Sequence, residues 1–117
     1  MFQSRLILRG LVLLTALMSS GGSVFAEQDK KSANYLMPGC RDPLTDSQSN
    51  AYLQGFCGGL VVGIFFMSGN KCSPRGVTNG QLYRVVVEYI DARPARMHED
   101  FKELAIEAMR AAWPCRR

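Results

Sequence analysis

The residues with the most evident chemistry are four cysteines, Cys40, Cys57, Cys72 and Cys115, which are spread widely along the chain. None of them belongs to a C-x-x-C pair, the spacing of thiol redox centres and of most structural zinc sites. In an exported chain, an even number of widely spaced cysteines is typical of structural disulfides. We therefore expect two disulfides, no metal site and no reactive thiol.

His98 is the only histidine and precedes Glu99 and Asp100, residue types that serve in acid–base catalysis and metal binding. Adjacent helix positions point in different directions, so these three side chains do not converge on one site. A Cys–His nucleophile is disfavoured because disulfides account for all four cysteines. No serine or carboxylate pair has a recognisable catalytic arrangement either. The sequence predicts a protein that is not an enzyme and needs no cofactor, with His98 as a surface or helix-capping residue.

Residues 1–26 have the pattern of a secretory signal peptide. A basic start without acidic residues is followed by a mainly apolar run, and Val24 and Ala26 place small residues at the −3 and −1 positions. The apolar run is shorter than the roughly 20 residues that a membrane-spanning helix needs. We expect cleavage after Ala26, export to the periplasm and no stable membrane insertion of the mature chain.

Removal of the signal peptide changes the charge of the protein. The full chain has a formal net charge of +4 at pH 7, which falls to +2 when Arg5 and Arg9 are removed. The remaining basic residues are interleaved with acidic ones, so the sequence offers no basic stripe and no support for nucleic-acid binding. The mature chain makes one small domain, whose core needs additional stabilisation from disulfides.

Residues 27–44 are polar, show no apolar period and contain Pro38, Gly39 and Pro43. This pattern predicts a mobile N-terminal lead-in, followed by a helical domain at residues 45–117.

The first helix of that domain is predicted to begin at a capping box formed by Thr45 and Gln48 and to run for about twenty residues. Its predicted core positions recur at three- and four-residue steps, at Tyr52, Leu53, Phe56, Leu60, Val61, Ile64 and Phe65. Gly55, Gly59 and Gly63 form a row that predicts a groove for close approach of another backbone. A membrane helix is the alternative, because residues 51–70 carry no charge, but the helical period favours a buried central helix.

Two further helices are predicted. The second begins at Thr78, which pairs with Gln81 in a capping box. Its predicted core positions are Leu82, Val85, Val86, Tyr89 and Ile90.

Pro94 suits the first turn of the third helix, which Trp113 and Pro114 end. Its apolar stripe is Met97, Phe101, Leu104, Ala105, Ala108, Met109 and Ala112. The expected fold is all-α, a small disulfide-stapled bundle of about three main helices in an up-down-up arrangement.

This arrangement bears on the disulfide pairing. Four cysteines allow three connectivities. Up-down-up helices place the residues after the first and third helices at the same end of the bundle, which favours Cys72–Cys115 and leaves Cys40 with Cys57. A tail that turns back after Pro114 would instead bring Cys115 to Cys57, so both pairings stay open.

Several ordered motifs give the chain a resemblance to the Rap/Tai immunity family, over about residues 34–115. The motifs are Gly55-Phe56-Cys57-x-Gly59, Cys72-x-Pro74-x-Gly76-Val77-Thr78-x-Gly80-Gln81, Arg84-Val85-Val86-Val87-x-Tyr89-Ile90, Arg93-Pro94-x-x-Met97-His98 and Ala112-Trp113-Pro114-Cys115. The resemblance implies a helical periplasmic protein that binds and blocks a peptidoglycan amidase delivered by a type VI secretion system. It also implies a homodimer. The alternative function is a periplasmic stress or chaperone-like protein that binds diverse clients.

A partner-binding surface is predicted at the turn before the third helix, with Asp91, Arg93, Arg96 and His98. Arginine is favoured at interfaces because its planar guanidinium makes paired hydrogen bonds. The alternative is that Asp91 and the arginines pair with each other across a solvated helix end, which contributes only about 0–1 kcal/mol.

Overall fold

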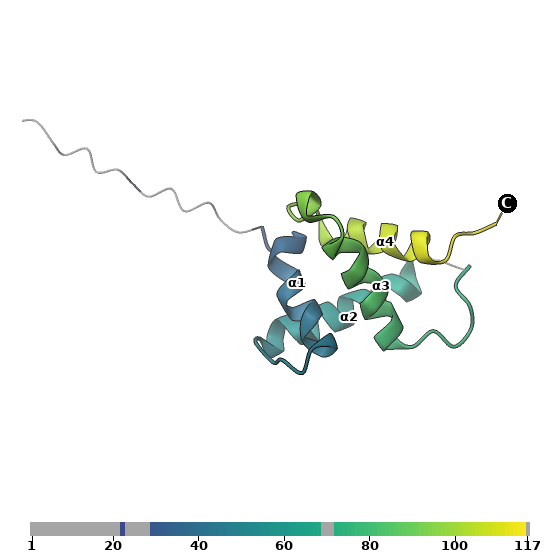
Figure 1. Ribbon diagram of the computed structural model, residues 1–117, viewed down its shortest axis with the longest axis horizontal. Coiled ribbons are helices and arrows are strands. Elements are labelled where there is room, and N and C mark those ends of the chain that lie inside the picture. The colour runs from purple at the N-terminus through teal and green to yellow at the C-terminus, as the bar shows by residue number, and fades with distance from the viewer. Residues whose placement is uncertain (1–21, 23–28, 69–71, 117) are drawn as a thin grey trace, which may run out of the picture.

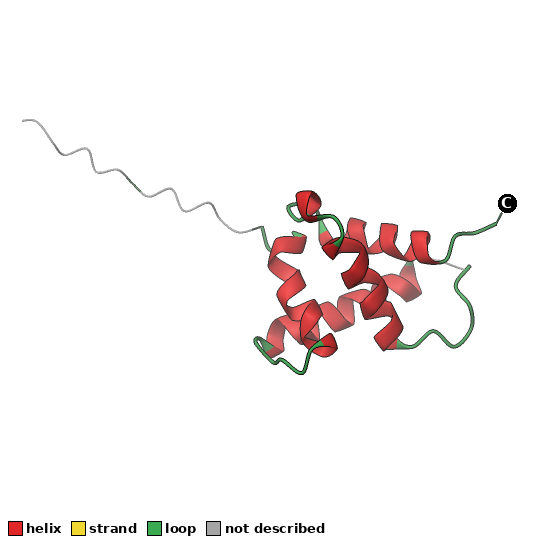
Figure 2. Ribbon diagram, viewed as in Figure 1, coloured by secondary structure: helices red, strands yellow, loops and turns green. Residues whose placement is uncertain are grey.

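The computed structural model describes residues 29–68 and 72–116, together with Gly22. Most of these residues are helical, and none lies in a β-strand (Figure 2). The predicted signal peptide lies outside the described residues apart from Gly22. No helix within the described residues has the length and apolar character needed to cross a membrane. The four α-helices are α1 (Ala33–Arg41), α2 (Ala51–Met67), α3 (Asn79–Asp91) and α4 (Phe101–Ala112).

The helices form one bundle (Figure 1), in which α1 packs mainly on α2 and α3 packs mainly on α4. Helix α2 also contacts both α3 and α4, so it is the central helix, as its sequence predicts. The all-α class is confirmed. The buried apolar core is Ala33, Leu36, Met37, Cys40, Leu53, Cys57, Val61, Ile64, Leu82, Val86, Val87, Ile90, Phe101, Leu104, Ala105, Ala108 and Met109.

The helix count is four rather than about three, because α1 lies within the segment predicted as an aperiodic lead-in. Ser32 caps this helix through its hydroxyl, which accepts a hydrogen bond from the Tyr35 amide. Pro38 lies inside the helix and removes one backbone donor, which ordinarily ends a helix. Here the burial of Leu36 and Met37 in the core stabilises the short helix in spite of its proline.

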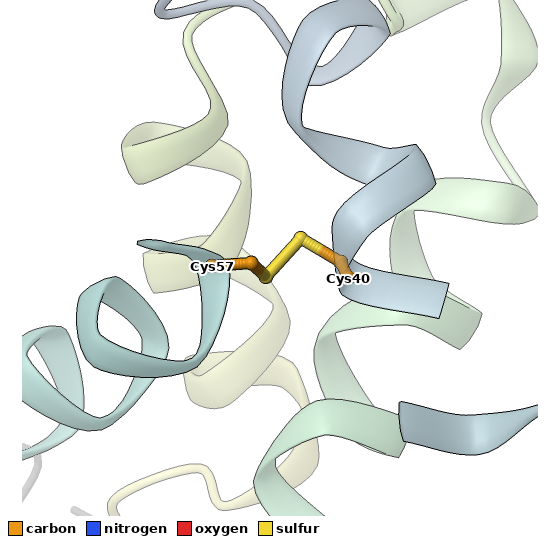
Figure 3. Close-up of a disulfide and its surroundings, with 2 residues drawn as sticks. All are labelled: Cys40 and Cys57. Carbon is orange, nitrogen blue, oxygen red and sulfur yellow. A yellow bond between two sulfur atoms is a disulfide. The ribbon is translucent and has the colours of Figure 1, made fainter. Parts of the chain in front are cut away.

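Helix α1 can pack closely on α2 because it has a glycine at the contact. A Cβ on Gly39 would lie 2.4 Å from the carbonyl carbon of Leu53, a distance that real Cβ contacts do not reach. The adjacent Cys40 forms a disulfide with Cys57 of α2, with a Cα–Cα distance of 5.3 Å. Figure 3 shows this bridge joining α1 to α2. A close backbone contact and a buried disulfide therefore hold the same pair of helices.

The second disulfide joins Cys72 to Cys115 and connects the segment before α3 with the tail after α4. Both of its cysteines are exposed. The structure therefore contains the Cys40–Cys57 and Cys72–Cys115 pairing, and the alternative of Cys57 with Cys115 is wrong.

Helix α2 begins five residues later than predicted, because its N-cap is Asn50 and not Thr45. Its first residue is Ala51, and the Asn50 side chain accepts a hydrogen bond from the Leu53 amide at 3.0 Å. Thr45 instead donates its hydroxyl hydrogen to the Arg41 carbonyl at the end of α1. The buried Asp42 carboxylate accepts hydrogen bonds from the backbone amide and hydroxyl of Ser49 and from the Asn50 amide. This loop holds the start of α2 in place, so the Thr45 capping-box prediction is wrong.

The capping box of α3 is confirmed. The Thr78 amide donates to Gln81 Oε1 at 2.9 Å, and the Gln81 amide donates to Thr78 Oγ1 at 3.2 Å. This match between sequence and structure follows from the short range of the motif, because both partners lie within one helical turn.

The start of the third predicted helix is different in the structure. Pro94 begins a separate 3₁₀ turn, Pro94–Arg96, and α4 begins only at Phe101. The Asp100 side chain caps α4 by accepting the Lys102 amide at 2.8 Å. Pro94 is therefore a turn residue and does not lie in the first turn of α4.

Candidate functional site

The predicted binding residues lie in the corner between α3 and α4, where Arg96 holds two carboxylates. Its Nε donates to Glu99 Oε1 at 2.8 Å and its Nη2 to Glu99 Oε2 at 2.7 Å. Its Nη1 donates to Glu107 Oε2, also at 2.8 Å. Because Glu107 lies on α4, Arg96 ties the 3₁₀ turn to that helix.

Tyr89 extends this network to α3. Its hydroxyl donates to Glu107 Oε2 at 3.0 Å, and the Arg93 guanidinium stacks on its ring, with Cζ 3.6 Å from the ring centroid. Arg93 also donates to the Tyr89 carbonyl at 2.8 Å. Each arginine of the corner is therefore engaged by residues of the same chain.

These contacts alter the acidity of the groups involved. The hydrogen bonds from Arg96 lower the pKa of the Glu99 carboxyl and of the Glu107 carboxyl below their usual range. The Tyr89 hydroxyl adds to the lowering of the Glu107 pKa. The same two carboxylates raise the pKa of Arg96. Arg96, Glu99 and Glu107 therefore form a set of matched charges.

Asp91 and His98 lie apart from this network. The Asp91 carboxylate accepts a hydrogen bond from Arg41 of α1, with Nε and Oδ1 separated by 3.2 Å, so it does not pair with the arginines of the corner. His98 is exposed. Among the described residues, no group of three His, Cys, Asp or Glu side chains is arranged to hold a metal ion. A role of the corner in partner binding stays a prediction. Arg93 and Arg96 already have partners within the chain, which a binding protein would have to replace or share.

A second candidate surface lies on the outer side of α2. Tyr52 and Phe56 are predicted core positions, but Tyr52 is 69% exposed and Phe56 is 46% exposed. Their rings stack with a centroid distance of 6.0 Å. Further along the helix, Phe66 and Met67 are also largely exposed. Exposed apolar side chains of this size are typical of interaction surfaces where they form a patch, as Tyr52 and Phe56 do.

The glycine row of α2 lies open in the structure. No atom of another described element lies within 4 Å of a Cβ built on Gly55, Gly59 or Gly63. The close approaches occur elsewhere, at Gly39 of α1 and at Gly58, whose Cβ would lie 3.0 Å from the Tyr83 hydroxyl. The predicted groove is therefore not filled by another helix of the described chain.

Phe56 also lines a cleft that the sequence does not reveal. The apolar part of its lining consists of Leu36, Phe56, Leu60 and Phe101, from α1, α2 and α4.

The rim of the same cleft is charged. It contains Lys30, Lys31, Asp100 and Lys102, from the segment before α1 and from the start of α4. We call this site the lysine cleft.

Comparison with known proteins identifies the family. The family model of Rap1a immunity proteins matches residues 32–115, from the N-cap of α1 to the last cysteine of the second disulfide. The chain belongs to the Rap1a immunity protein family. No curated protein and no solved structure matches it significantly. Membership of the Rap1a family implies that the chain binds a protein effector, and proteins of such immunity families are typically not enzymes.

The functional interpretation of this Rap1a chain therefore depends on its surfaces. Sequence reasoning selected the corner, because it is rich in arginine, and assigned Tyr52 and Phe56 to the core. The composition of α2 could have indicated the exposed aromatic residues. This helix is apolar around its whole circumference, so its sequence does not define a buried face. An excess of apolar residues over what the core can bury predicts an exposed apolar surface.

Proposed function

We propose that this Rap1a-family chain is a periplasmic immunity protein that binds and inhibits a peptidoglycan amidase delivered by a type VI secretion system. The observation that carries the proposal is the family match over residues 32–115, which includes all four helices. The motif resemblance to the Rap/Tai immunity family supports an amidase as the target. The signal-peptide pattern and two disulfides support the periplasm, an oxidising compartment in which the cell wall is accessible.

The experiment that tests this proposal is capture of type VI amidases by the oxidised protein. The full chain is expressed with its own leader, purified from the periplasm and mixed with a panel of these amidases at neutral pH. We expect one stoichiometric complex, in which cleavage of purified peptidoglycan is lost. Light scattering of the free protein tests the homodimer that the resemblance implies. Failure of every amidase to bind would contradict the proposal.

A chaperone-like role is the second candidate, and one observation favours it. Tyr52, Phe66 and Met67 expose apolar surface of the kind that binds unfolded chains. A chaperone would suppress aggregation of unrelated proteins and would bind more strongly at acid pH, with no defined stoichiometry. An inhibitor would bind one enzyme at neutral pH and leave unrelated unfolded proteins in solution unaffected.

A further inference from the structure

The dimensions of the lysine cleft favour an anchoring side chain over a whole small molecule. The cleft has a volume of about 240 Å³, whereas pockets for small molecules typically measure about 300–1,000 Å³. Leu36 and Phe101 in its lining are buried, Leu60 is half-buried, and Phe56 is exposed beside Tyr52. One large apolar side chain, inserted from a partner, would cover the apolar surface that Phe56 and Leu60 leave exposed.

The rim of the cleft is held rigidly by backbone hydrogen bonds. The Phe101 amide donates to the Lys31 carbonyl at 2.8 Å, and the Ala33 amide donates to the Glu99 carbonyl at 3.0 Å. Ser32 and Asp100 form an isolated β-bridge between these pairs. The backbone of the segment before α1 is thereby fixed to the start of α4, so a ligand does not have to order the backbone of the rim.

The charges of the rim favour an acidic ligand. In the described part of the chain, no carboxylate pairs with the ammonium group of Lys30 or Lys31. The nearby carboxylates of Asp29 and Asp100 accept the backbone amides of Lys31 and Lys102.

The third lysine of the rim has a weak partner. Lys102 pairs with Glu103 at 3.2 Å, but both side chains are more than half exposed, so this pair is easily exchanged for another carboxylate.

We propose that the lysine cleft anchors one large apolar side chain of a partner protein, in a segment where Asp or Glu residues flank that side chain. Desolvated anchors in pockets carry most of the affinity of many interfaces, and complementary charge around them sets specificity and association rate. The inference rests on the proposed function, since the partner is taken to be the inhibited effector. It names the surface of this chain that the effector contacts.

Two pairs of variants test the inference against a captured amidase. Phe56→Ala removes part of the apolar lining, and Glu88→Ala is its control, because Glu88 is an exposed residue of α3 outside the cleft. We expect a Kd increase of at least about 30-fold for Phe56→Ala, the size typical of an anchor site, and less than about 2-fold for Glu88→Ala.

The charge of the rim is tested in the same assay. Lys30→Glu combined with Lys31→Glu is compared with Arg84→Glu combined with Arg110→Glu, which reverses two exposed charges outside the cleft. We expect a Kd increase of about 10-fold for the lysine pair, smaller at high salt, and little change for the arginine pair. Thermal melting of each variant checks that the fold is retained.

A second measurement does not depend on the effector. Amide resonances of the oxidised full chain are followed by NMR during titration with a synthetic peptide in which one phenylalanine is flanked by glutamates. We expect shifts at Lys31, Leu60 and Lys102, and none with a peptide in which lysines replace the glutamates. Dodecanoate is titrated as an amphiphilic anion that is not a protein.

The outcomes separate this inference from the proposed function. If the acidic peptide shifts the cleft resonances but no amidase binds, the preference of the cleft for an apolar side chain with acidic neighbours stands, whereas the proposed function and the amidase as partner fail. An amidase that binds all variants with equal affinity would leave the proposed function intact and overturn the cleft inference. Shifts with dodecanoate but not with the peptide would also overturn it, as would a homodimer in which the cleft is covered.

Discussion

Helix α2 has an inner face that other helices cover and an outer face that they leave open. On the inner face, Gly39 of α1 approaches so closely that a Cβ would lie 2.4 Å from the Leu53 backbone. On the outer face, Gly55, Gly59 and Gly63 have no atom of another described element within 4 Å of their Cβ positions. The glycine row of α2 therefore makes close packing possible without bringing it about, and α1 packs closely on α2 at its own glycine, Gly39.

The largest expected effect comes from removing the disulfide of the inner face. Cys40→Ala combined with Cys57→Ala should lower the free energy of unfolding by about 3–5 kcal/mol, since the crosslink is lost and two buried sites lose packing. Urea unfolding followed by circular dichroism measures the change. The control is Cys72→Ala combined with Cys115→Ala, at an exposed disulfide.

Comparison of the two disulfide variants also discriminates between two sources of the stability loss, chain entropy of the unfolded state and packing in the folded state. Chain entropy alone predicts the larger cost for the exposed disulfide, because it spans 43 residues and the buried one spans 17. We expect the reverse order, because burial adds a packing term at Cys40 and Cys57. A larger loss for the exposed pair would show that the unfolded state dominates and that the inner face is not specially stabilised.

The next effect is expected at the contact between α1 and α2. Gly39→Ala should lower the free energy of unfolding by about 2–3 kcal/mol, because its Cβ meets the Leu53 backbone and the helices must separate. The same unfolding assay measures it. If Gly39→Ala left the free energy of unfolding unchanged, α1 would shift freely on α2, contrary to the close approach of Gly39 to Leu53.

The matched substitution on the outer face should have the opposite sign. Gly59→Ala adds a methyl group into open space within a helix, so it should raise the free energy of unfolding by about 0.5–1 kcal/mol. Comparison of unfolding midpoints in urea measures this gain. Destabilisation would indicate that something covers the outer face in solution, and a second copy of the chain would then be detected by light scattering.

The smallest effect is expected from acid, which acts on the corner and not on the faces of α2. Glu99 and Glu107 have lowered pKa values in the folded protein. Their contribution to the free energy of unfolding is therefore fully present above the unfolded pKa of about 4.3, and it is lost as pH falls through the lower folded pKa. Arg96→Ala should therefore reduce the fall in melting temperature below about pH 5, relative to an Arg84→Ala control. An unchanged pH profile would contradict a stabilising role for Arg96.

Where sequence reasoning succeeded, the partners lie close together in the chain. Thr78 and Gln81 form the capping box of α3 as predicted, and α4 ends before Trp113 as predicted. Where it failed, a distant contact decided the result. Thr45 and Gln48 match the capping pattern equally well, but the loop held by Asp42 starts α2 later.

The candidate sites show the same difference between local and distant contacts. The arginine-rich corner was predicted from residues next to each other in sequence, yet the guanidinium of Arg96 is engaged partly by Glu107, from a different element. The lysine cleft was not predicted, because it combines the segment before α1 with the middle of α2 and the start of α4. Its residues have no sequence pattern in common.

By itself the sequence determined the helical class, the capping of α3, the presence of paired cysteines and the motifs of an immunity family. These features depend on side chains within about one helical turn of each other or on residue identity. The tertiary structure decided that α1 forms despite Pro38, which face of α2 is buried, and that Phe56 is exposed at a cleft. A helix that is apolar on every side has no preferred buried face of its own, so its packing against the other helices determines which face is buried.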